Sequence, residues 1–158
     1  VRNTGEYPTA GRFDGMMAWR QDTNSLYVFD GSSTWEFLAA VPELTTSTSI
    51  VTAATGFSTS EVRLKKWGPF LVGMVSMQRT GANITASSSG NIADTLVGTL
   101  AAGWRPASAS YDSCGDGTAN GEYRVDTDGT FTLRSWSPNA SVSNASAAIR
   151  FSMRFDLP

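Results

Sequence analysis

The side chains that could do chemistry in this chain are few, and their types restrict what that chemistry could be. The 158 residues include 14 aspartates and glutamates and one cysteine, Cys114, but no histidine. Without histidine the chain has no Ser-His-Asp or Cys-His nucleophile and no metal site that uses imidazole. A carboxylate pair acting as general acid and base remains possible. Because most of the acidic residues stand beside glycine, threonine or asparagine, as turn residues do, we expect no enzyme, no cofactor and no metal.

A second group of residues could bind a ligand rather than transform it. Trp136 continues the period-two series of polar residues in the predicted strand 130–134, which places its ring on the polar face. An aromatic ring on an exposed face stacks on a sugar or contacts a partner. Ligand binding is not the only interpretation of these residues. The tryptophan could instead contact another subunit, and the nearby aspartates could serve only to form turns. The predicted ligand-binding residues are Trp136, Arg134, Asn139, Asp112 and Asp116.

Charge and hydropathy exclude two further classes of function. The formal net charge is -2 and no run of basic residues is present. A nucleic-acid-binding domain normally carries a basic patch or stripe, so we expect no nucleic-acid partner. No segment approaches the roughly 18 apolar residues of a membrane span, so we expect no membrane insertion. The chain begins with Val1 rather than Met, and we expect a fragment or a processed product.

The elements that must position these residues are strands. Period-two alternation is clearest at 149–157, where apolar residues alternate with charged and hydroxyl residues. A hairpin precedes it, because two alternating segments flank Thr127-Asp128-Gly129. Further strands are expected near 50–57, 61–67, 70–79, 91–100 and 105–114. About eight strands without a long helical period predict an all-β domain over residues 50–158, a jelly-roll-like β-sandwich.

Residues 1–38 differ from the rest by their many aromatic side chains. Strands are predicted near 15–21, 25–30 and 34–38, with turns at Asp22-Thr23-Asn24 and Asp30-Gly31-Ser32. A unit below about 40 residues rarely buries enough surface to be stable alone. This small β-hairpin module must therefore pack on the sandwich or on copies of itself. Residues 39–49, rich in serine and threonine, are predicted to be a linker.

The strand predicted at 70–79 is apolar on both faces. A surface strand of a monomeric sandwich should alternate apolar with polar residues. Cover for the second face would come from elsewhere in the same chain or from a neighbouring chain related by closed symmetry. We predict an oligomer contact formed by Leu71, Val75, Met77, Trp19 and Trp35.

The segment TLAAGWRP, residues 99–106, puts an aromatic, a cation and a proline directly after a glycine. Proline lacks an N–H and belongs at the start or edge of a strand, and tryptophan near a sheet corner usually serves packing. A ligand-gripping loop could have the same composition. We favour a structural corner formed by Gly103, Trp104, Arg105 and Pro106.

Both parts of the chain resemble proteins of bacteriophage tail fibres. GRFDGMMAWRQDTNSLYVFDGSSTWEFL, residues 11–38, resembles a small module of phage fibre and structural proteins, with its Asp-Thr, Leu-Tyr, Asp-Gly and Trp in order. TLAAGWRP and YRVDTDGTFTL resemble the C-terminal head domains of such fibres. In those domains an apolar strand leads through a short glycine loop to Gly-Tyr/Trp-Arg-Pro, and a later hairpin has an Asp-Gly turn.

The resemblance implies a homotrimeric fibre or spike tip on the virion surface. Such a domain would be joined to other virion proteins through the chain before Val1 and could contact a host cell-surface glycan. A head-decoration, head-fibre or baseplate protein with the same folds is an alternative. A secreted carbohydrate-binding module is another, expected to be a monomer with an exposed aromatic platform.

Overall fold

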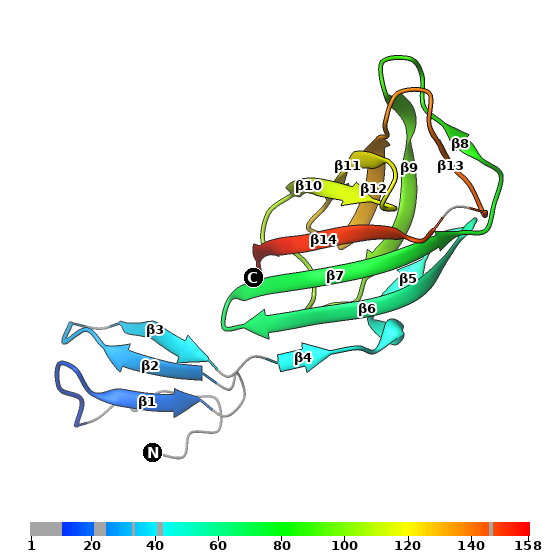
Figure 1. The fold of residues 1–158 in the computed structure, drawn as a ribbon. Helices are drawn as coiled ribbons and strands as arrows, with labels where there is room; N and C mark the ends of the chain where they lie inside the picture. Colours follow the sequence, from blue (N-terminus) through cyan, green and yellow to red (C-terminus); the bar gives the residue numbers. More distant parts are fainter. Residues whose placement is uncertain (1–10, 21–24, 33, 41–42, 146) are drawn as a thin grey trace. The chain divides into compact units, whose positions relative to one another are not determined.

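The structure, a computed structural model, describes residues 11–20, 25–32, 34–40, 43–145 and 147–158 (Figure 1). Apart from the 3-10 turn η1 (Thr48–Ile50), the elements in these residues are β-strands, so the all-β prediction is confirmed. None of the described residues forms a helix long and apolar enough to cross a membrane. The chain divides into two compact units: Val1–Glu43 with Lys66–Gly68, and Leu44–Lys65 with Pro69–Pro158.

The first unit contains a three-stranded antiparallel sheet in the order β1-β2-β3. Rings on neighbouring strands pack together, with centroids of Tyr27 and Phe37 5.8 Å apart and those of Phe29 and Trp35 5.4 Å apart. The three strands lie where the sequence predicted them, whereas the predicted turn at Asp22-Thr23-Asn24 lies outside the described residues. Their bounds are β1 (Met17–Arg20), β2 (Ser25–Phe29) and β3 (Trp35–Ala40).

One carboxylate holds the turn between β2 and β3. Asp30 accepts hydrogen bonds from the hydroxyl of Thr34 at 2.7 Å and from the hydroxyl of Ser32 at 2.8 Å, and from both backbone N–H groups at 3.0 Å. These bonds, led by the Thr34 hydroxyl, favour the ionised form and hold the pKa of Asp30 well below its ordinary value. The predicted turn at Asp30-Gly31-Ser32 is thus present as an Asx turn.

The second unit contains a nine-stranded sheet in the order β4-β6-β7-β14-β10-β11-β12-β9-β5. Its two edge strands are consecutive in the chain and are joined through η1, so the sheet curls strongly between them (Figure 1). A separate two-stranded ribbon pairs β8 with β13. The bounds are β4 (Glu43–Thr45), β5 (Val51–Ala53), β6 (Phe57–Trp67), β7 (Phe70–Arg79), β8 (Ile84–Thr85), β9 (Asn91–Leu100), β10 (Ser110–Gly115), β11 (Asn120–Val125), β12 (Thr130–Ser135), β13 (Ser141–Val142) and β14 (Ile149–Asp156).

A narrow seam joins two halves of this sheet. β14 and β10 pair only through Cys114↔Phe151 and Gly115↔Arg150. Phe151 of β14 nevertheless has its ring centroid 5.0 Å from that of Tyr123 on β11 and 5.4 Å from that of Phe131 on β12. The halves β4-β6-β7-β14 and β10-β11-β12-β9-β5 therefore face each other across one core. Where the sequence predicted two separate sheets, hydrogen bonding runs through all nine strands.

The strand prediction for residues 50–158 differs from the structure in three places. The predicted strands 50–57 and 61–67 become the short β5 and the long β6, and β10 begins at Ser110 rather than near residue 105. The ribbon β8/β13 was not predicted. The predicted linker 39–49 contains β4 and the start of η1, so this segment closes one edge of the sheet.

The inner face of β7 belongs to the core of the chain itself. Leu71, Val75 and Met77 are all 0% exposed, so the prediction that these side chains lie in a contact between chains is wrong. The opposite face of the strand is the open one, because Phe70 is 49% and Val72 37% exposed. The curl of the sheet supplies the cover that the prediction assigned to a neighbour.

Residues 101–104 form a tight turn where the sequence predicted a corner. The N–H of Trp104 donates to the carbonyl of Ala101 at 3.1 Å, and Gly103 has φ +80°, which L side chains rarely adopt. Trp104 and Pro106 are buried, and the Nε–H of Arg105 donates to the carbonyl of Leu100 at 3.1 Å. The aromatic, the cation and the proline all serve this corner.

Candidate functional site

The five predicted ligand-binding residues do not come together in one site. Trp136 is 2% exposed, so its predicted place on the polar face is wrong. β12 ends at Ser135, just after a bulge shifts its pairing with β9 between Leu133 and Ser135. The alternation of the strand therefore no longer fixes the face on which Trp136 lies. The N–H of Trp136 donates to the carbonyl of Gly90 at 3.0 Å, which fixes the chain after the bulge.

Two more predicted residues serve turns, as the alternative interpretation proposed for the aspartates. The carboxylate of Asp116 accepts from the N–H of Ala119 at 2.8 Å and from the N–H and hydroxyl of Thr118 at 2.9 and 2.8 Å. Burial raises the pKa of Asp116, but these hydrogen bonds outweigh it, so the pKa lies below its ordinary value. Asn139 has φ +59° and closes the turn 137–140, a position for which asparagine is well suited.

Arg134 belongs instead to a surface that the sequence did not predict. Tyr111 on β10 is 53% exposed, and two guanidinium groups lie over its ring. The Cζ atoms of Arg124 on β11 and Arg134 on β12 are each 5.7 Å from the ring centroid. We call these three residues, with the acidic residues that pair with the arginines, the arginine–tyrosine face.

Strand register explains why these residues meet. Tyr111 is paired with Arg124, which is paired with Thr132, which is paired with Leu96 of β9. Paired residues of antiparallel strands lie on the same side of a sheet. The four side chains therefore form a row across the outer side of β10, β11, β12 and β9, and Leu96 in that row is 46% exposed.

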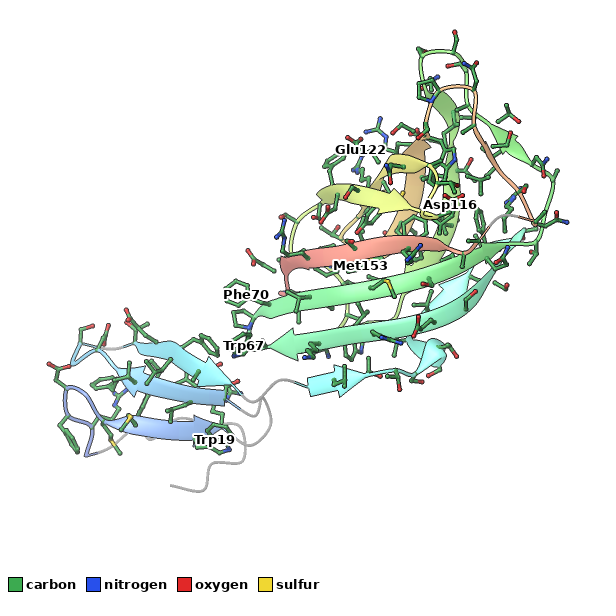
Figure 2. All side chains as sticks on the ribbon, in the orientation of Figure 1. Trp19, Trp67, Phe70, Asp116, Glu122 and Met153 are labelled. Carbon is green, nitrogen blue, oxygen red and sulfur yellow. The ribbon has the colours of Figure 1, made fainter. Side chains whose placement is uncertain are left out.

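Carboxylates balance the two arginines of this face. Arg124 forms an ion pair with Asp126, and Arg134 lies 3.5 Å from Asp94 and 3.9 Å from Glu122. Figure 2 labels Glu122 on β11, in the half of the sheet that carries this face. Guanidinium and carboxylate groups around an exposed ring supply donors and acceptors beside an apolar surface, which suits a sugar ring with its hydroxyls.

The sequence contained one signal for Tyr111. Cys114 is buried, and burial raises its pKa to about 12. Tyr111 is three residues away in the same strand, so alternation places it on the opposite, outer face. No group of three or more residues able to hold a metal ion was found among the residues that the structure describes.

Comparison of the chain with protein-family models, with curated proteins and with solved structures gave no match.

Proposed function

We propose that this chain is a non-enzymatic virion protein of a bacteriophage, the tip domain of a tail fibre or spike that attaches to the host surface. The observation that carries the attachment role is the exposed ring of Tyr111 on the sheet, with two guanidinium groups over it. Rings on a firm scaffold bind at low entropic cost, because little freedom is lost on binding. The phage assignment rests on the resemblance of residues 11–38 and of TLAAGWRP and YRVDTDGTFTL to fibre proteins.

The proposal includes a homotrimer with a jelly-roll-like head. Phe70 and Val72, on the outer face of β7, are two of the exposed apolar residues of the described chain, and a neighbouring chain that packs on this face would cover them. Phe70 is labelled at the start of this strand in Figure 2. In the small sheet, Trp19 and Trp35 are half-buried and remain candidate contacts. Fibre axes favour threefold closed symmetry among copies of one chain.

The experiment is a pair of measurements on the 158-residue chain. Light scattering should give the mass of a trimer, and a glycan array should show binding to oligosaccharides of bacterial envelopes. Tyr111→Ala should abolish the binding without changing the mass or the melting temperature. Phe13→Ala is the matched control, because Phe13 is 66% exposed but lies in the small-sheet unit. Binding that survives Tyr111→Ala would contradict the role of this face.

A secreted carbohydrate-binding module is the second candidate, favoured by the same exposed tyrosine. It predicts a monomer at high concentration together with glycan binding through Tyr111, so the mass separates it from a fibre tip. A head-decoration, head-fibre or baseplate protein would also form part of the virion. Electron microscopy of virions labelled with an antibody to this chain would place it on the tail or on the head.

A further inference from the structure

A groove runs along the outer side of β14, where β10 separates from it. Beyond the two pairs Cys114↔Phe151 and Gly115↔Arg150 the strands diverge, and the space between them remains open at the surface. One part of the groove has a volume of about 370 Å³ and the next about 580 Å³, and both parts are lined by Ser113 and Ser152.

Two arginines, Arg150 and Arg154, lie along this groove, one in each part. Arg150 and Arg154 are exposed on the outer face of β14, and no acidic side chain within the described ranges forms an ion pair with either of them. By contrast, Arg63, Arg124 and Arg134 each pair with a carboxylate. Four residues of a strand span about 13 Å, so the groove has a cation in each part.

The Arg150 guanidinium lies against the neighbouring turn. A Cβ built on Gly117, which has φ +97°, would lie 2.9 Å from Nη2 of Arg150. The carboxylate in that turn, Asp116, is already engaged by Thr118 and Ala119 and is buried. Among the described residues, the carboxylate of this turn therefore forms no ion pair with the guanidinium of Arg150 beside it.

The rest of the lining mixes polar side chains with the apolar Val72 and Met153 and the thiol of Cys114. Hydroxyls of Ser113 and Ser152, the amide of Asn120 and the carboxylate of Asp112 provide both donors and acceptors. The hydroxyl of Tyr123 donates to the carbonyl of Ser152 from inside the sheet. Burial raises the pKa of Tyr123, so this donor stays protonated and holds the strand beside the groove.

We propose that this groove binds an acidic oligosaccharide, with Arg150 and Arg154 each pairing with one carboxylate of the sugar chain. The groove shares no residue with the arginine–tyrosine face and is a second site. Its part beside Arg154 includes Val72, which the proposed contact between chains also uses, whereas its part beside Arg150 does not. Sugar hydroxyls match the mixed donors and acceptors between the arginines. A nucleic acid fits less well, because the groove lining has no aromatic ring for base stacking and the chain carries net charge -2.

The test titrates the full chain with tetragalacturonate and follows the amide resonances of β10 and β14 by nuclear magnetic resonance. The methyl ester of the same tetrasaccharide is a neutral ligand of similar shape, and a single-stranded oligonucleotide is the competing polyanion. The variants are Arg150→Gln, Arg154→Gln and, as a matched control, Arg63→Gln, which removes an exposed arginine of β6 that already has a partner.

We expect the acidic tetrasaccharide to bind in the millimolar range or more tightly and to shift the groove resonances. Each groove variant should weaken binding about tenfold, since a hydrogen bond to a charged group is typically worth that much, and Arg63→Gln should change it less than about twofold. Equal binding of the methyl ester, equal loss in all three variants, or shifts outside the groove would overturn the proposal. So would tighter binding of the oligonucleotide, or no shift in β10 or β14 at millimolar tetragalacturonate.

Discussion

The two faces of β7 have similar side chains and opposite environments. Leu71 and Val75 on the inner face are fully buried, whereas Phe70 and Val72 on the outer face are substantially exposed. The neighbouring strand distinguishes the faces, because Val75 is paired with Phe151 and Val72 with Arg154. For a strand that is apolar on both faces, the alternation of the paired strand therefore shows which face is buried. The polar side of β14 lies on the same side of the sheet as the outer face of β7.

The largest effect should come from a charge on the inner face. Val75→Asp would put a carboxylate among fully buried apolar side chains, and an uncompensated buried charge costs several kcal/mol. We expect a loss of more than about 4 kcal/mol in the free energy of unfolding, a large part of the total for a domain of this size. Urea denaturation followed by tryptophan fluorescence measures it, with Lys65→Asp on the exposed side of β6 as the control. If Val75→Asp folds normally and fails only to assemble, the conclusion that Val75 lies in the core would be wrong, and the residue would belong to a contact between chains.

A cavity in the core should have the next largest effect. Phe151→Ala removes a fully buried ring that packs against Tyr123 and Phe131, and such truncations cost about 3–5 kcal/mol. Arg150→Ala, one residue away on the outer face, should cost less than about 0.5 kcal/mol. Thermal unfolding of both variants compares the faces within one strand, and equal losses would show that the inner and outer sides of β14 are wrongly assigned.

How far the sequence predicts this molecule depends on whether alternation stays in register. It does along β14, so this strand lies where the pattern placed it, and Gly103 marked the corner. It fails for Trp136, which is buried and lies beyond the end of β12, after the register shift that follows Leu133. No residue type in 133–136 announces that shift.

Most of the residues of the candidate site could not be predicted from the sequence, for a related reason. The arginine–tyrosine face combines Tyr111 and Arg134, which are on strands that are not neighbours. The groove opens where β10 leaves β14, two strands that lie far apart in the chain. Both depend on pairing between distant segments. Period-two patterns give the face of each strand but not its neighbours.

A titration should distinguish the buried turn at the end of β10 from the exposed carboxylates. The pKa of Asp116 lies below its ordinary value of 3.8, so its ionised form stabilises the fold above that pH. This stability is lost as the pH falls through the lower pKa of the folded state. Asp116→Asn should cost about 1 kcal/mol at pH 7, and the difference from the unaltered chain should shrink below about pH 4.

Urea denaturation between pH 2 and 7 measures this difference. Asp94→Asn is the control, because Asp94 has a 60% exposed side chain and a single 3.5 Å ion pair, and exposed pairs contribute little. A difference for Asp116→Asn that stays constant down to the lowest pH would show that the ionised carboxylate is not what holds the turn.

The smallest effect on stability, and the most informative for assembly, should come from the outer face of β7. Val72→Asp places a charge on a side chain that is 37% exposed, so the free energy of unfolding should fall by less than about 1 kcal/mol. If a neighbouring chain covers this face, however, the same charge is desolvated in the assembly, and the mass measured by light scattering should drop from trimer to monomer. Thr52→Asp adds an equal charge to an exposed position of β5, at the far edge of the sheet, and should leave the mass unchanged.

A trimer that tolerates Val72→Asp would place the contact elsewhere, and the half-buried Trp19 and Trp35 of the small sheet would then be the positions to substitute next.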